Sequence, residues 1–186
     1  MGQVAIFIDG GYLDKVTFYD HKNVRLDYKK LIDEMTQPDE LIRAYYYHCL
    51  PYQSNPPTVD ENNRFSSKQK FYHALSMLPR FQIRLGKLVC RGVSQNGEKI
   101  LIQKRVDTMV GVDMALLAGK GKITRLVLFS GDSDLIPAIE AVKTEGVVTT
   151  LWHGSISENT APSQDLYELC DERTLLSDVI VGRCLR

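Results

Sequence analysis

The sequence predicts an α/β fold, a three-layer α/β/α sandwich with a mostly parallel central sheet, and three observations lead to it. Residues 4–8 and 126–129 are apolar runs too short for helices, which is typical of strands buried on both faces. Segments with a helical period of apolar residues alternate with such strands, and right-handed crossovers then place helices on both sides of the sheet. At 186 residues the chain has the length of one domain, which we expect to span residues 1–186.

Prolines and glycines divide the first half of the chain into elements. Asp9-Gly10-Gly11 ends the first strand, and Pro38 and Pro51 close the next helix and strand. The expected elements are a strand at residues 4–8, a helix at 25–36, a strand at 41–50, a loop at 51–63 and a helix from about Ser66 to Leu78.

The second half contains the strongest hairpin signal of the sequence, Asn96-Gly97 between two β-like runs. Glycines end both helices that follow it. The expected elements are strands at residues 81–90 and 100–102, a helix at 107–118, a strand at 126–129, a helix over 135–142, a strand at 147–152, a short helix near 163–172 and one further strand.

The composition excludes several classes of protein. The 23 Lys and Arg residues balance the 23 Asp and Glu residues, so no net charge attracts the molecule to nucleic acid. No apolar run approaches the ~18 residues of a membrane span, and the first residues lack the basic segment of a signal peptide. The four cysteines are scattered without zinc-type spacing, and we expect reduced thiols in a cytoplasmic protein, monomeric or weakly dimeric.

The neutral total conceals two regions of opposite charge. Residues 80–105 contain seven basic residues and one acid, whereas residues 132–172 contain nine acids and one basic residue. Because phosphate contacts dominate nucleic-acid affinity, the basic region predicts binding to nucleic acid. Lys and Arg also discourage aggregation of an exposed edge hairpin, which is the alternative explanation. The candidate contacts are Arg91, Lys99, Lys104 and Arg105.

Five aromatic residues could stack on unpaired bases. They are Tyr45, Tyr46, Tyr47, Tyr52 and Phe65. Aromatic residues that alternate in a strand also build cores, so the pattern leaves both roles open.

Acidic residues follow two of the predicted strands. Asp9 ends the first strand, and Asp132 and Asp134 follow the strand at 126–129. Asp107 opens the preceding helix, although the hairpin before it leaves open at which edge of the sheet it lies. Ligands of open parallel sheets bind at the carboxyl ends of the strands. Carboxylates that share a pocket there need a cation to stay ionised, and oxygen ligands suit Mg²⁺ or Mn²⁺.

Each of these acids also has a structural explanation. Asp9 could be a turn residue, Asp134 a helix cap and Asp107 a charge that stabilises a helix N-terminus. Asp113 lies close to the apolar stripe of its helix, where we expect it to support the metal ligands. The acids taken together favour the shared site.

Glycines accompany these acids. Gly10 and Gly11 follow Asp9, and Gly131 precedes Asp132. Because glycine has no side chain, this arrangement predicts that a ligand approaches the backbone closely.

Three blocks, IFIDGGYL, KRVDTMVGVDMALLA and LVLFSGDSDLIPAIEAVKTEG, resemble the signature blocks of NYN domains, a branch of the PIN-like nucleases. The tail LYELCDERTLLSDVI resembles that family's closing helix and strand, so the resemblance covers almost the whole chain. It implies a PIN-like fold and metal-dependent ribonuclease activity. The acids that it assigns to catalysis and metal binding are Asp9, Asp107, Asp132 and Asp134, with Asp113 as a further metal-site residue. The family's first block often carries Asn a few positions after its Asp, whereas residues 10–14 contain none, and Asp14 could take that place.

We therefore expect a metal-dependent nuclease, a hydrolase that acts as an endoribonuclease on single-stranded or structured RNA. Bound Mg²⁺ or Mn²⁺ would activate water and stabilise the charge that develops on the phosphodiester. The alternative is a non-catalytic RNA-binding or regulatory module on the same fold. Phosphatase-like chemistry on an aspartate nucleophile ranks last, because it wants a second Asp at position 11, which is glycine.

Overall fold

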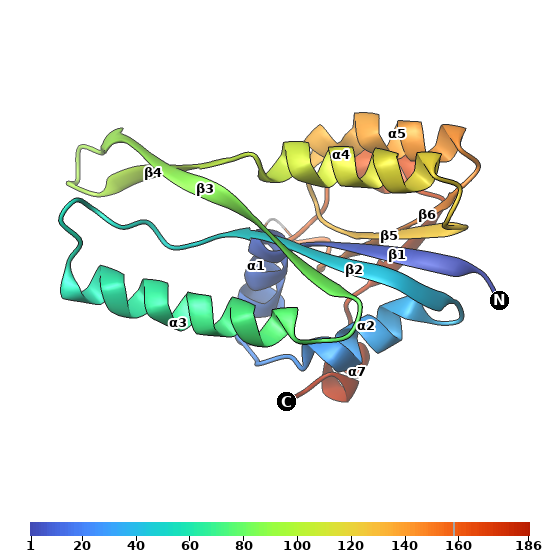
Figure 1. Ribbon diagram of the computed structural model, residues 1–186, viewed down its shortest axis with the longest axis horizontal. Coiled ribbons are helices and arrows are strands. Elements are labelled where there is room, and N and C mark those ends of the chain that lie inside the picture. The colour runs from blue at the N-terminus through green and yellow to red at the C-terminus, as the bar shows by residue number, and fades with distance from the viewer. Residues whose placement is uncertain (158) are drawn as a thin grey trace.

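The computed structural model describes residues 1–157 and 159–186, and its strands form one seven-stranded sheet (Figure 1). The strands are β1 (Gln3–Asp9), β2 (Glu40–Cys49), β3 (Phe81–Val93), β4 (Lys99–Lys104), β5 (Arg125–Phe129), β6 (Val148–His153) and β7 (Glu172–Leu175). Their order across the sheet is β4-β3-β2-β1-β5-β6-β7. All neighbours run parallel except β3 and β4, so the predicted mostly parallel sheet is confirmed.

Helices cover both faces of this sheet, which confirms the three-layer arrangement (Figure 1). One face carries α1 (Gly10–Asp20), α2 (Tyr28–Thr36), α3 (Val59–Ser76) and α7 (Asp178–Arg183). The other face carries α4 (Val106–Gly119), α5 (Ile136–Thr144) and α6 (Gln164–Leu169), and a short 3-10 helix, η1 (Ser133–Leu135), leads into α5. None of the helices in the described part of the chain combines the length and apolar character that a membrane crossing demands.

The central strand β1 explains why the sequence opens on an apolar run. Val4, Ile6 and Ile8 pack into the core on the α1 side, while Ala5 and Phe7 pack into the core on the α4 side. All five are fully buried. A strand covered on both faces cannot alternate apolar and polar residues, and β1 accordingly does not.

Two helices were not predicted, and a third begins earlier than expected. Helix α1 follows Asp9 directly, although its first residues are two glycines. Helix α3 begins at Val59, because Thr58 and Glu61 form a reciprocal capping box, so the loop predicted over 51–63 is wrong for its last five residues. Helix α7, capped by Ser177, is only six residues long.

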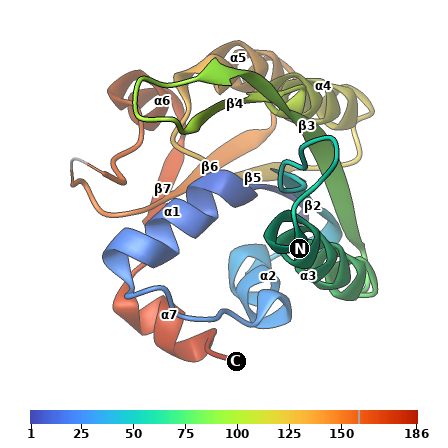
Figure 2. The same cartoon turned by 90° about the vertical axis from the view of Figure 1, so that its left-hand side faces the viewer.

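The β3–β4 hairpin settles the position of α4. The first part of β3 pairs with β2 as far as Gly86, and the rest pairs only with β4, so the hairpin extends beyond the sheet (Figure 1). Strand β4 returns antiparallel and brings Lys104 back opposite Lys87, next to the carboxyl end of β2. Helix α4 therefore begins at the carboxyl edge of the parallel strands, the edge that faces the viewer in Figure 2.

Candidate functional site

Asp9 lies where the sheet order reverses, because β1 has β2 on one side and β5 on the other. Its Oδ1 atom accepts hydrogen bonds from the backbone N–H groups of Gly11 (2.9 Å) and Tyr12 (3.1 Å), so Asp9 is also the N-cap of α1. The hydroxyl of Ser130, which follows β5, lies 3.5 Å from the other oxygen, Oδ2. In open α/β sheets, ligands bind at this kind of position.

Asp132 and Asp134 follow β5 in the segment that leads into α5. The Oδ1 atom of Asp132 accepts a hydrogen bond from the backbone N–H of Asp134 (2.9 Å), which makes Asp132 the N-cap of η1. The N–H of Asp132 donates to the hydroxyl of Ser130 (3.3 Å). Ser130 therefore contacts both Asp9 and Asp132.

An open cleft of about 490 Å³ lies over these residues. Its walls come from the end of β1, the first turns of α1, the segment after β5 and the segment before α6. The lining residues are Asp9, Gly11, Tyr12, Lys15, Gly131, Asp132, Ser133, Ala161, Pro162 and Ser163. Asp9 and Asp132 thus face one cleft, although they are more than 120 positions apart in the sequence.

Asp107 reaches the same edge from a third segment, the first turn of α4. Loss of hydration raises the pKa of its carboxyl group, and the charges of Asp132 and Asp134 raise it further. Burial raises the pKa of Asp9 against the hydrogen bonds that it accepts from the backbone, and Asp107 adds to the increase. Like charges act in this way only over short distances. The structure therefore brings all four predicted acids into one group of interacting charges.

This group suits a divalent cation in its chemistry. All four side chains offer carboxylate oxygen, the donor that Mg²⁺ and Mn²⁺ prefer. Burial is the main cause of the raised pKa values of Asp9 and Asp107, and repulsion by neighbouring acids is a smaller one. A bound cation would relieve that repulsion. Within residues 1–157 and 159–186, no three acidic, His or Cys side chains are gathered closely enough to form a ready-made metal cage.

Asp113 faces different partners, nearly two turns further along α4. Its carboxylate accepts a hydrogen bond from the hydroxyl of Tyr47 (2.9 Å) and pairs with the guanidinium of Arg84 (3.1 Å). Asp113 and Arg84 line a separate hollow of about 330 Å³ together with Arg105. Asp113 thus connects α4 to β2 and β3, and the structure does not bring it to the other acids.

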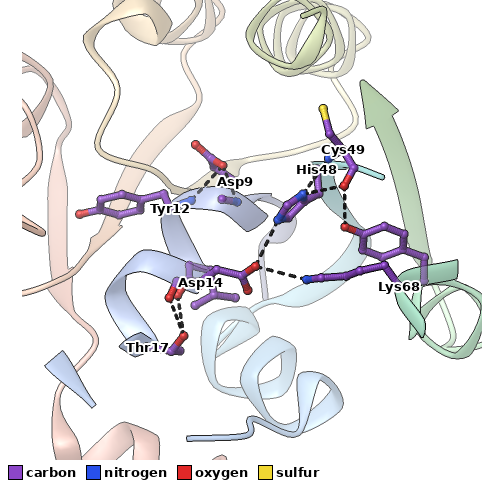
Figure 3. Close-up of polar contacts among 10 residues, drawn as sticks. Asp9, Tyr12, Asp14, Thr17, His48, Cys49 and Lys68 are labelled. Carbon is purple, nitrogen blue, oxygen red and sulfur yellow. Dashed lines mark hydrogen bonds and ion pairs between the residues drawn. The ribbon is translucent and has the colours of Figure 1, made fainter. Parts of the chain in front are cut away.

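A polar cluster that was not predicted from the sequence lies beside Asp9 (Figure 3). The Oδ2 atom of Asp14 accepts hydrogen bonds from Nε2 of His48 (3.2 Å) and from Nζ of Lys68 (3.3 Å). Burial alone would raise the pKa of Asp14, but these two partners lower it overall. His48 directly follows Tyr47, the residue of β2 that is paired with Asp9. Partners 34 and 54 positions apart leave no local pattern in the sequence.

The glycines beside the acids approach aromatic rings of the protein. A Cβ atom at Gly10 would lie 2.4 Å from the ring of Tyr46, and one at Gly131 would lie 2.7 Å from the ring of Tyr12. At Gly11 the nearest atom would be Oδ1 of Asp9, at 3.4 Å. Core packing therefore accounts for Gly10 and Gly131, and the expected approach of a ligand is not needed to explain them.

The predicted nucleic-acid contacts lie along the hairpin. Lys104 and Arg105 are exposed where β4 meets α4, and Arg105 has a positive φ of 76° two positions before Asp107. Arg91 is exposed farther out on β3. Lys99 is paired with Glu61 of α3 (2.7 Å), so its charge is already partnered within the protein.

Comparisons with known proteins identify a matching family model and similar solved structures. The family model of the NYN domain matches residues 3–177. Among solved structures, the chain is similar to a Vibrio parahaemolyticus protein of unknown function, with 21% identity and a TM-score of 0.68 over 100% of this chain and 96% of that one. The CheB methylesterase catalytic domain of Thermotoga maritima has 16% identity and a TM-score of 0.42 over 97% of each chain. No curated protein matches the sequence.

Proposed function

The chain belongs to the NYN-domain family of PIN-like nucleases, and from this premise we propose that it is a metal-dependent endoribonuclease acting on single-stranded or structured RNA. The observation that carries the proposal is the position of Asp9, Asp107, Asp132 and Asp134 at one edge of the sheet. Burial raises the pKa values of Asp9 and Asp107, and neighbouring acids of this group raise them further.

The four carboxylates would hold Mg²⁺ or Mn²⁺. When bound, such an ion supplies a Lewis acid that lowers the pKa of a water molecule and neutralises charge on the phosphodiester. The chain's own part is to fix the oxygens. Backbone N–H groups orient Asp9 through Oδ1, and the hydroxyl of Ser130 lies between Asp9 and Asp132.

The basic hairpin supplies the binding side of the proposal. Lys104 and Arg105 stand two to three positions before Asp107, so phosphates that they contact would lie next to the acids. The four cysteines, all free, suit the reducing cytoplasm. We also propose that residues 1–186 act as one domain, monomeric or weakly dimeric.

The second candidate function is a non-catalytic RNA-binding or regulatory module. The observation that favours it is the engagement of Asp14. Residues 10–14 lack the Asn that the family often carries, and the carboxylate of Asp14 contacts His48 and Lys68 instead. The edge of the sheet that carries the other acids therefore lacks the polar side chain that this Asn would supply.

Cleavage of an RNA panel separates the two functions. Single-stranded, hairpin and duplex RNAs would be incubated with the wild-type chain in Mn²⁺, in Mg²⁺ and in EDTA, next to an Asp9→Asn/Asp132→Asn double variant. Asparagine keeps a cap acceptor at both positions, so the variant tests charge rather than folding. If the chain is a nuclease, the wild type should cleave RNA in Mn²⁺ or Mg²⁺ but not in EDTA, and the double variant should not cleave it.

Binding without cleavage in either metal would support the regulatory module. Cleavage that survives both EDTA and the double substitution would contradict the carboxylate site.

A further inference from the structure

Of the aromatic residues that could stack on bases, Tyr46 and Tyr47 are fully buried in the core. Tyr45 is partly buried, and its ring packs against the core and stacks on Phe7 with ring centroids 5.1 Å apart. Tyr52 is also partly buried, but it lies after the end of β2 and packs against neither core cluster. Core packing therefore does not explain Tyr52.

Tyr52 lines a cavity of about 450 Å³ between the β3–β4 hairpin and the N-terminal end of α3. Pro51, Leu88 and Leu101 supply apolar walls. The charged lining residues are two cations, Arg64 and Lys99, and two acids, Glu61 and Glu98. Figure 1 shows this end of the molecule on the left, where the hairpin and α3 extend past the sheet. An aromatic ring with apolar walls and adjacent cations is the set of groups that binds unpaired nucleotides.

Glu61 holds the three walls of the cavity in place. It accepts hydrogen bonds from the backbone N–H groups of Ser54 (3.1 Å) and Thr58 (2.9 Å), from the Ser54 hydroxyl, and from Nζ of Lys99 (2.7 Å). These contacts join the loop after β2, the start of α3 and the hairpin. The same Lys99 ammonium lies 4.9 Å from the centroid of the Tyr52 ring. Since four donors surround Glu61, its charge does not repel a phosphate strongly.

Strand β4 connects this cavity to the acids. It begins at Lys99 and ends at Lys104, and Asp107 follows three positions later. Five residue steps along a strand span about 17 Å. Arg64 stands at the cavity end of this path, and the exposed Lys104 and Arg105 stand at the other, so a chain of phosphates can follow it from the cavity to the carboxylates.

We propose that this cavity receives one unpaired base of the substrate, stacked on Tyr52, and that it thereby selects single-stranded over duplex RNA. The proposal rests on the proposed function, because it takes RNA as the ligand of the edge acids. Bases of a duplex are stacked on one another and cannot enter the cavity without unpairing. In a single strand no base pair has to be broken for a base to enter.

Binding to matched single-stranded and duplex RNAs of the same sequence tests this. Anisotropy would be measured in EDTA, which separates binding from cleavage, for the wild type, Tyr52→Ala, Tyr52→Leu and Tyr52→Phe. Loss of the ring should weaken single-strand binding by about 5- to 150-fold, the range for removal of one base–aromatic stack. Duplex binding should change less than twofold. Tyr52→Phe keeps the ring and should bind like the wild type.

Tyr19→Ala is the matched control, because Tyr19 is an exposed tyrosine of α1 away from the cavity. It should leave single-strand binding unchanged. Tyr52→Leu replaces the ring by a smaller apolar side chain, and duplex binding retained by both the alanine and the leucine variant excludes simple loss of folding. Equal binding by wild type and both variants, with metal-dependent cleavage intact, would overturn the base site alone. A wild type that binds neither RNA would overturn this inference and the proposed function together.

Discussion

The Oδ2 atom of Asp14 lies 3.2 Å from Nε2 of His48. The same oxygen meets Lys68, so the carboxylate points to β2 and α3 rather than toward the other acids (Figure 3). Asp14 is therefore occupied as an anchor for His48 and Lys68. We therefore expect that it does not replace the Asn that residues 10–14 lack.

Asp14→Asn should consequently keep most of the activity, whereas Asp9→Asn should abolish it. A partly exposed ion pair contributes up to ~1 kcal/mol, which corresponds to about fivefold at most. Initial cleavage rates in Mn²⁺ compare the two variants. If Asp14→Asn is as inactive as Asp9→Asn, then Asp14 reaches the metal during the reaction.

Asp132→Asn should abolish cleavage and raise the melting temperature in EDTA. Asparagine still accepts from the N–H of Asp134, so the cap of η1 remains, while the charge that raises the pKa of Asp107 is gone. The wild type, but not the variant, should gain about 2.7 kcal/mol at a hundredfold excess of Mn²⁺ over its dissociation constant. Thermal melts of both proteins with EDTA and with Mn²⁺ provide the measurement. If the variant melts at a lower temperature than the wild type and Mn²⁺ does not stabilise the wild type, Asp132 acts only as the cap of η1 and the metal site is contradicted.

Lys104→Ala/Arg105→Ala should weaken binding to all RNA sequences equally. Phosphate contacts carry no sequence information, and loss of two of them should flatten the logarithmic salt slope for single strands by about 1.4. Titrations at several salt concentrations measure it. Lys120→Ala/Lys122→Ala, at the far end of α4, is the control and should not change the slope. An unchanged slope in the hairpin variant would remove these two residues from the interface.

Two neighbouring glycines should respond oppositely to alanine. At Gly10 the added methyl group would overlap the buried ring of Tyr46, whereas at Gly11 only Oδ1 of Asp9 is near, at 3.4 Å. We expect Gly10→Ala to cost about 2 kcal/mol and to lower the melting temperature by about 4–8 °C. Gly11→Ala should be neutral or slightly stabilising, because alanine favours helices. Equal melting temperatures of the two variants would show that the Tyr46 ring yields easily.

Asp39 should make the protein sensitive to acid. Its hydrogen bond from Arg125 (2.7 Å) lowers the pKa of its carboxyl group. A lowered folded-state pKa means that the contribution to stability is complete above the unfolded value, near ~3.9, and is lost as the pH falls through the folded value. Melting temperatures from pH 7 to pH 2 should therefore fall below about pH 4, and Asp39→Asn should flatten that part of the curve. An identical acid limb in both proteins would contradict this.

The strands of the sheet could be predicted from the sequence, because parallel strands buried on both faces consist of apolar runs. Acidic residues then marked where two of these runs end. Helix α1 could not be predicted in this way. It starts with the poorest helix formers, Gly10 and Gly11, and its stability comes from the Asp9 cap and from burial of Leu13 and Val16. The position of Asp107 was undetermined for a different reason. Only the length of β3 beyond the sheet decides where β4 returns.

Within the candidate site, strand ends predicted which acids lie at the carboxyl edge of the sheet, but not which residues they contact there. The positions of Ser130 and His48 beside Asp9 follow from the pairing of β1 with β2 and β5, which joins residues far apart in the sequence. For Asp113 the sequence predicted the place on its helix but not the partners. Its position near the apolar stripe was predicted correctly, whereas its partners Tyr47 and Arg84 come from strands that are distant in the sequence.

The central place of β1 also has a consequence for synthesis on the ribosome. Val4 pairs with Arg125, so β1 cannot complete its second edge until β5 has left the exit tunnel. At 5–20 residues per second, translation of the 121 residues from position 5 to Arg125 takes about 6–24 s. During that time the fully buried apolar run of β1 has one edge paired at most with β2. The other edge stays open to pairing with other chains, which is the exposure that makes a nascent chain prone to aggregation.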